Sequence, residues 1–158
     1  MKIKNIKLLV YSILICQLAG IIGSFATASS VSTWYLAINK PSFNPPSWIF
    51  GPVWLTLFTL MGISLYLIWQ KAKEDKRAKF ARNFFLIHLV FNTLWSYLFF
   101  GLQKIGIAFF EISFLLVFIT YLTYIFGKIN KLAGILLIPY LLWGSFATIL
   151  NYAIWQLN

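Results

Sequence analysis

Five long apolar stretches constrain this chain more than any other feature of its sequence. They cover residues 8–28, 49–69, 83–102, 105–127 and 132–157. A helix needs about 20 apolar residues to cross roughly 30 Å of hydrocarbon, and each stretch reaches that length. The runs are continuous, whereas the strands of a membrane β-barrel alternate between apolar and polar residues. The sequence therefore predicts an all-α integral membrane protein, a single domain over residues 1–158 built as a bundle of five transmembrane helices.

The charge of the chain fits a lipid bilayer rather than a nucleic acid. Hydrophobic residues make up 61% of the chain and charged residues 10%, which is too little charge to cover a surface that faces water. All but two of the thirteen lysines and arginines, Lys40 and Lys104, lie on one side of the predicted helices. By the positive-inside rule, the N-terminus is cytoplasmic and the first loop lies on the outer side. The basic segment 71–82 is expected to be a solvated loop facing anionic headgroups.

The first inter-helix segment, 29–48, is long and contains several prolines and aromatic residues. Proline fixes φ and disfavours helix at the residue before it, so this segment is predicted to be a shaped loop with little regular structure. Two interpretations stay open for its aromatic side chains. They could form a lid over a binding site, or they could sit among the headgroups as an interfacial belt. The residues concerned are Trp34, Tyr35, Pro41, Phe43, Pro45, Pro46 and Trp48.

Polar and aromatic residues follow one face of three predicted helices. At 100° per residue, each set forms a single stripe, and buried amides and indole N–H groups need partners that lipid cannot supply. The stripes should therefore face inward and enclose an aromatic cavity beneath the first loop, suited to a large planar ligand. Ordinary helix packing is the alternative interpretation. The stripes are Trp54, Phe58, Met61 and Leu65; His88, Asn92, Trp95 and Phe99; and Tyr140, Trp143, Ala147 and Asn151.

Several of these polar side chains also have a purely structural interpretation. Asn92 and Asn151 could bond between helices, and His88 could do the same or ligate haem. Glu111 is an acid inside an apolar stretch, so it could mark a proton path or remain a protonated or interface-exposed carboxyl. Because the chain has three acids, one histidine and one cysteine, we expect no metal site and no hydrolytic catalytic group.

Small residues follow one face of the first apolar stretch. Gly20, Ser24 and Ala28 are spaced four residues apart. Such a strip lets a neighbouring helix approach closely. We therefore expect it to mark a helix contact.

Three separated blocks resemble the tryptophan-rich sensory protein/translocator protein (TspO/MBR) family. The first block runs from a Trp-Tyr pair through Lys-Pro and Pro-Pro to Pro-Val-Trp, and it covers residues 34–54. The second has the form Asn-x-x-Trp-x-x-x-Phe-Phe from Asn92, and the third has Pro-Tyr-x-x-Trp from Pro139 followed by Ala-x-x-Leu-Asn from Ala147. One feature of animal members is missing, because no basic residue follows Tyr152. Cholesterol binding is therefore not expected, and a bacterial cytoplasmic membrane is favoured.

The resemblance implies a membrane receptor or sensor for porphyrins such as protoporphyrin IX or haem. It also implies binding of benzodiazepine-type and isoquinoline-carboxamide-type ligands, with no cofactor required. Two further functions are implied: degradation of protoporphyrin IX with light and oxygen, in which Trp54 and Trp143 would act, and transport of porphyrin or another small molecule. A homodimer is expected by the same resemblance. The implied contacts are Trp34, Tyr35, Trp54, Phe58, Asn92, Trp95, Phe99, Trp143 and Ala147, with Lys40, His88, Tyr140 and Asn151 as secondary candidates.

The resemblance also gives these residues physical roles. The aromatic side chains would stack on the ligand, and Asn92 and the indole N–H of Trp54 would donate to a ligand carbonyl or carboxylate. Ala147 would leave room for the ligand. Lys40 would pair with a porphyrin propionate.

Overall fold

The structure contains the helix bundle expected from the apolar stretches. The computed structural model describes residues 5–158, so Lys2 and Lys4, which support the predicted orientation, lie outside the described residues. Counting α4 and η1 as one span, five helices are long and apolar enough to cross a membrane. The prediction of an all-α five-helix membrane protein is confirmed. The elements are α1 (Ile6–Val31), α2 (Trp34–Ala37), α3 (Ser47–Lys71), α4 (Lys76–Ser96), the π-helical turn η1 (Tyr97–Gly101), α5 (Ile105–Ile129) and α6 (Lys131–Leu157).

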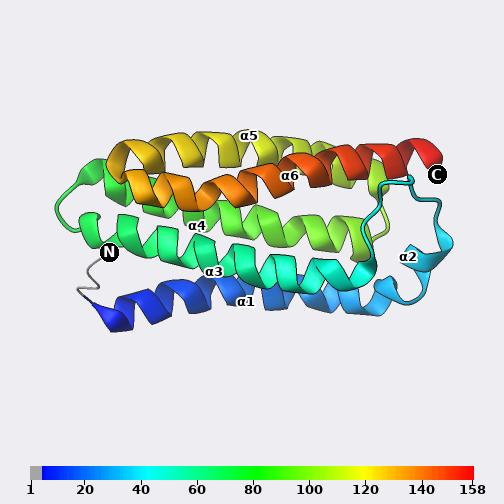
Figure 1. Cartoon of the computed structure of the whole chain (residues 1–158), viewed down its shortest axis with the longest axis horizontal. Coiled ribbons are helices and arrows are strands. Elements are labelled where there is room, and N and C mark those ends of the chain that lie inside the picture. The colour runs from blue at the N-terminus through cyan, green and yellow to red at the C-terminus, as the bar shows by residue number, and fades with distance from the viewer. Residues whose placement is uncertain (1–4) are drawn as a thin grey trace.

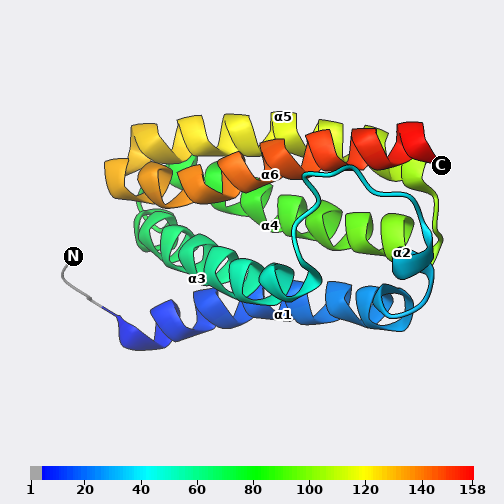
Figure 2. The ribbon, with the colours of Figure 1, turned by 45° about the vertical axis from the view of Figure 1, so that its right-hand side comes forward.

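The long helices run along one common direction, and glycines set two of their closest approaches. Helices α5 and α6 lie side by side, and α1 lies at the opposite edge of the bundle (Figures 1 and 2). A Cβ atom on Gly134 would lie 2.6 Å from the Cα of Gly127 on α5. A Cβ atom on Gly62 of α3 would lie 2.5 Å from the Cα of Ile13 on α1. These backbones can meet only because no side chain stands between them.

Side-chain caps begin three of the membrane helices. The side chain of Asn5 accepts from the backbone N–H of Leu8, and the carboxylate of Asp75 accepts from Arg77. Asn130 caps α6 in the same way. Each cap satisfies N–H groups that the first helical turn leaves without partners.

The basic segment 71–82 differs from the prediction, because most of it is helical. Helix α4 begins at Lys76, directly after the Asp75 cap, so only the start of the segment is a connection. Ala78 and Ala81 are fully buried in the bundle core, which places the charged side chains between them on the outer face. The two alanines have a helical spacing of three residues, but the prediction followed the many charged residues around them. The solvated-loop interpretation is therefore wrong for Lys76–Arg82.

The lid between α1 and α3 contains more regular structure than the prolines suggested. Helix α1 continues to Val31, and the Trp34–Ala37 segment forms the short helix α2. Apart from the turn at residues 32–33, the irregular part is residues 38–46, which contain the Pro-rich part of the segment. The expectation of little regular structure is wrong for the first half of the lid, because Pro41 restricts only the chain close to it.

Lys40 fastens the lid internally instead of reaching outward. Its ammonium group donates to the backbone carbonyls of Tyr35 at 2.6 Å and Ile38 at 2.7 Å. A third carbonyl, that of Leu36, lies at 3.3 Å. These carbonyls are at the C-terminal end of α2, where a cation is favourable. Lys40 is therefore already engaged, which does not support the expected pairing with a porphyrin propionate.

One further contact holds the lid together internally, and a pair of hydrogen bonds ties the lid to the bundle. The Tyr35 hydroxyl donates to Oδ1 of Asn44 at 2.7 Å. Burial of the side chain raises the pKa of the Tyr35 phenol, so the hydroxyl keeps its proton and remains a donor. Asn39 exchanges hydrogen bonds with the C-terminal end of α6: its N–H donates to Oδ1 of Asn158 at 2.9 Å, and Nδ2 of Asn158 donates back to the Asn39 carbonyl at 2.9 Å.

We expect Lys40→Met to loosen the lid while the bundle stays folded. The substitution keeps the apolar stem and removes the charge-assisted hydrogen bonds to α2. Losing about 1.5 kcal/mol of such bonding would speed amide hydrogen exchange in residues 36–44 by roughly tenfold. Lys104→Met is the matched control, because Lys104 is exposed at the same end of the molecule. Equal exchange in both variants would contradict the role assigned to Lys40.

Candidate ligand-binding site

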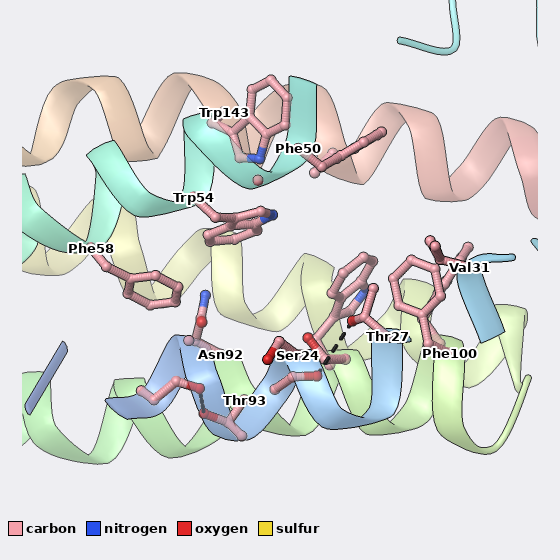
Figure 3. Close-up of a pocket in the computed structure, with 18 of the residues that line it drawn as sticks. Ser24, Thr27, Val31, Phe50, Trp54, Phe58, Asn92, Thr93, Phe100 and Trp143 are labelled. Carbon is pink, nitrogen blue, oxygen red and sulfur yellow. Dashed lines mark hydrogen bonds between the residues drawn. The ribbon is translucent and has the colours of Figure 1, made fainter. Parts of the chain in front are cut away.

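A cavity of about 420 Å³ lies beneath the lid, among α1, α3, α4, η1 and α6. This volume is in the range of small-molecule sites. Figure 3 shows the rings of Trp54, Phe58 and Trp143 on one side of the space and Asn92 and Ser24 on the other. Aromatic rings form much of the wall, and hydroxyl groups and amides interrupt it.

The structure brings most of the predicted contact residues together around this cavity. Asn151, a secondary candidate, lines it as well. Trp34 does not: its ring packs edge-on against Phe99 at 5.6 Å and Phe100 at 6.5 Å, so it supports the wall from behind. The predicted residues that line the cavity are Tyr35, Trp54, Phe58, Asn92, Trp95, Phe99, Trp143 and Ala147. Their ligand contacts stay a prediction.

Two stacked aromatic pairs give the cavity flat surfaces. Trp54 stacks on Phe58, with ring centroids 5.3 Å apart and planes inclined by 28°. Trp95 stacks on Phe99 at 5.2 Å and 23°. The Phe58 ring is seated against Gly20 of α1, where a Cβ atom would come within 2.5 Å of the ring. Because both pairs are parallel to within 30°, each presents an extended π-surface to a planar ligand.

A buried hydrogen-bond network fixes the amide of Asn92. Its Nδ2 donates to the Tyr140 hydroxyl at 2.7 Å, and this hydroxyl lies 3.1 Å from Nε2 of His88. All three side chains are buried. The interhelical interpretation of His88 and Asn92 thus describes this network, and neither His88 nor Tyr140 lines the cavity. Part of the donor capacity of Asn92 is already used by Tyr140, which leaves its carbonyl oxygen and second N–H for a ligand.

We expect Tyr140→Phe to destabilise the protein. The substitution keeps the ring and leaves Asn92 and His88 without the partner they share, in a buried setting where each unsatisfied group costs about 1–3 kcal/mol. The check is the thermal midpoint in a lipid nanodisc. Tyr152→Phe is the control, because Tyr152 is 48% exposed and keeps its ring contacts as phenylalanine. Equal midpoints for the two variants would show that the network contributes little.

Asn151 fixes the indole of Trp95 in the cavity wall. It accepts from Nε1 of Trp95 at 3.0 Å, and its Nδ2 donates to the Ile105 carbonyl at 3.0 Å. By contrast, the indole N–H groups of Trp54 and Trp143 donate to no other residue within 5–158. The Trp143 nitrogen points toward Trp54 in Figure 3. The cavity therefore offers two indole donors to a ligand.

Sequence reasoning missed the wall that α1 contributes. Gln17, Ser24, Thr27 and Val31 line the cavity from this helix, together with Gly20. The strip containing Gly20 and Ser24 was interpreted as a helix contact, which holds for Gly20 but not for Ser24. The signal that could have found this wall is the hydroxyl content of the strip, since a pure packing strip needs only small side chains. Phe50, Thr93 and Phe100 are further lining residues that the stripes did not include.

Glu111, the acidic residue within the membrane-spanning part of α5, lies apart from the cavity. Both carboxyl oxygens of Glu111 are enclosed and have no hydrogen-bond partner among the described residues. Glu111 does not line the cavity. The described part of the chain contains no group of three or more His, Cys, Asp or Glu side chains that could hold a metal ion. The site's own groups are thus suited to stacking and hydrogen bonding.

Likeness to known proteins extends along most of the chain. A family model described as the TspO/MBR family matches residues 12–156. The chain is 44% identical to the tryptophan-rich protein TspO of Archaeoglobus fulgidus, over 98% of this chain and 99% of that protein. It is 38% identical to the protein of the same name from Chlorobaculum tepidum, over 98% of both. It is 35% identical to the translocator protein of Homo sapiens, over 79% of this chain and 75% of that protein.

Proposed function

The chain belongs to the TspO/MBR family, and from that premise we propose that its cavity binds a tetrapyrrole such as protoporphyrin IX or haem. The protein is a multi-pass membrane protein, and its relatives include a protein named tryptophan-rich sensory protein. The observation that carries the proposal is the pair of stacked aromatic surfaces in a cavity that also offers the indole N–H groups of Trp54 and Trp143. A large planar ring that carries carboxylates matches both features.

The same groups suit smaller synthetic ligands. A benzodiazepine or isoquinoline carboxamide combines fused aromatic rings with a carbonyl acceptor. Its rings would stack on Trp54 and Phe58, and its carbonyl would accept from an indole N–H. Ala147 on α6 leaves room on the opposite wall. Burial beneath the lid would strengthen these polar contacts because water is excluded.

Quenching of tryptophan fluorescence by protoporphyrin IX tests the proposal. We expect saturable quenching at micromolar ligand, and a weaker response in Trp54→Phe. Trp48→Phe is the matched control, because Trp48 is 74% exposed on the same helix and does not line the cavity. Absence of saturable quenching, or equal loss in the two variants, would contradict binding in this cavity.

A second function, degradation of bound protoporphyrin with light and oxygen, is favoured by the position of the two indoles. Trp54 and Trp143 both line the cavity, where they would contact an excited porphyrin directly. The chemistry would come from the ligand and oxygen, with the protein supplying position. The Soret band should fall faster under illumination with the wild type than with Trp143→Phe. A band that is equally stable in both samples would exclude this activity.

A further inference from the structure

One side of the cavity faces outward from the helix bundle. The exposed lining residues lie on α1 and the first turns of α3: Ile21, Ser24, Ser47, Gly51 and Leu55. Ile21 is 52% exposed and Leu55 is 62% exposed. By contrast, the lining residues of α4, η1 and α6 are buried or half-buried. The opening therefore lies between α1 and α3. Helix α1 itself lies at an edge of the bundle (Figure 2).

The opening begins where the contact between α1 and α3 ends. On the side away from the lid, the backbones meet at Ile13 and Gly62. Closer to the lid, the Gln17 amide bridges the two helices by donating to the Leu55 carbonyl at 3.1 Å and the Thr59 hydroxyl at 3.0 Å. Beyond this bridge the Phe58 ring of α3 still packs against Gly20. At its lid end α1 contacts η1 instead, because the Ser30 hydroxyl donates to a carbonyl of η1. Gln17 thus joins α1 and α3 on the side of the opening away from the lid. Among the described residues, no side-chain hydrogen bond joins these two helices closer to the lid.

On the α2 side, the lid end of the cavity is filled by packed rings. The Tyr35 ring lies 5.5 Å from Phe100 and 6.3 Å from Phe99, so aromatic contacts fill the space under α2. The irregular part of the lid is bound to α6 through Asn39 and Asn158. A ligand that entered past α2 or between the lid and α6 would have to break these contacts.

The depth of the opening places it against hydrocarbon. Leu55 is eight residues from the start of α3 at Ser47, which is about 12 Å along a helix. Ile21 is ten residues from the end of α1 at Val31, or about 15 Å. With a hydrocarbon core of roughly 30 Å, the opening extends from the lid side to near the middle of the bilayer. Acyl chains therefore surround it.

We propose that the cavity receives its ligand sideways from the lid-side leaflet, through the opening between α1 and α3, and that a lipid acyl chain occupies the opening when no ligand is bound. This proposal rests on the proposed function and adds the route and the class of ligand, a flat amphiphilic molecule dissolved in the membrane with its ring among the acyl chains. The Ser24 and Thr27 hydroxyls, which donate to carbonyls of their own helix, form a wall without unpaired donors along that route. The apolar ring of such a ligand can pass this wall without leaving a polar group of the protein unpaired.

Binding kinetics in proteoliposomes with protoporphyrin IX dissolved in the lipid test the route. Ser24→Phe narrows the opening and should slow association on the order of tenfold. Ala28→Phe is the matched control, because Ala28 is an exposed small residue one turn further along α1 that does not line the cavity. Asn158→Ala removes the bonds to Asn39 and should leave association unchanged.

The outcomes separate the route from the site. Unchanged association in Ser24→Phe, or a weaker affinity with unchanged association, would overturn the side route. Faster association in Asn158→Ala would overturn it in favour of access through the lid. If Ser24→Phe does not fold, Leu55→Phe on the rim formed by α3 gives the same test. A wild type that shows no saturable binding would instead remove the proposed function, and the route with it.

Discussion

Ala147→Trp should abolish binding of protoporphyrin IX, with a loss of affinity of at least about 100-fold, or roughly 2.7 kcal/mol. Ala147 lines the cavity from α6, together with Trp143 of the same helix. An indole at this position would extend into the space that the ligand needs, while the helix backbone keeps its contacts. The loss should be seen as absent quenching of tryptophan fluorescence at ligand concentrations that saturate the wild type.

The control for this variant is Leu142→Trp, which adds an indole to the same helix. Leu142 is 65% exposed and does not line the cavity, so this variant should bind as the wild type does. The thermal midpoints of both variants should remain close to that of the wild type. Retained binding in Ala147→Trp would show that the ligand lies elsewhere.

Gly134→Ala should strongly destabilise the bundle, whereas Gly127→Ala should not. A Cβ atom on Gly134 would lie 2.6 Å from the Cα of Gly127, 2.8 Å from its N and 3.1 Å from the Thr123 carbonyl oxygen, and all of these are backbone atoms. Backbone cannot move aside as a side chain can, so α5 and α6 must separate, at a cost of about 1–3 kcal/mol or more. A Cβ atom on Gly127 meets only the Cα of Gly134, at 3.9 Å, which is ordinary contact.

The two glycine variants make the same chemical change on facing helices, with opposite expected signs. In Gly127→Ala the gain in helix propensity, about 1 kcal/mol, is not offset by a clash. Thermal unfolding in nanodiscs should place the midpoint of Gly127→Ala at or above that of the wild type and that of Gly134→Ala well below it. Equal midpoints would mean that the interface between α5 and α6 adapts to an added methyl group.

The fold could be predicted from the sequence because a helix that crosses lipid must be apolar along its whole length. Five apolar stretches of membrane-spanning length admit few alternatives, and their order along the chain is also the order of the helices. The errors occurred where polar residues dominate. Lys76–Arg82 is helical because Ala78 and Ala81 pack into the core, and charge density concealed that spacing. The short helix α2 was hidden by the prolines that follow it.

The candidate site was only partly accessible, for reasons of three-dimensional packing. The lid-side parts of the three stripes meet around one cavity, because their indoles and amides face inward. The other parts, Met61, Leu65, His88 and Tyr140, are buried in the core and do not line it. A sequence pattern can indicate that a side chain faces inward, but it does not show whether that side chain reaches the cavity. It could therefore not show that Trp34 packs behind Phe99 instead of lining the cavity. Nor could it show that Lys40 caps α2. The contribution of α1 was missed because small and hydroxyl residues suit a helix contact as well as a cavity wall.

The position of a bound porphyrin tests the central proposal most directly. Zinc protoporphyrin IX carries a metal whose anomalous scattering locates the ring centre in a crystal of the complex. We expect one peak per chain, inside the cavity that Trp54, Trp143 and Asn92 line, and no peak in crystals of Ala147→Trp. A peak outside the helix bundle, or on the surface of the lid, would contradict binding between these indoles and amides.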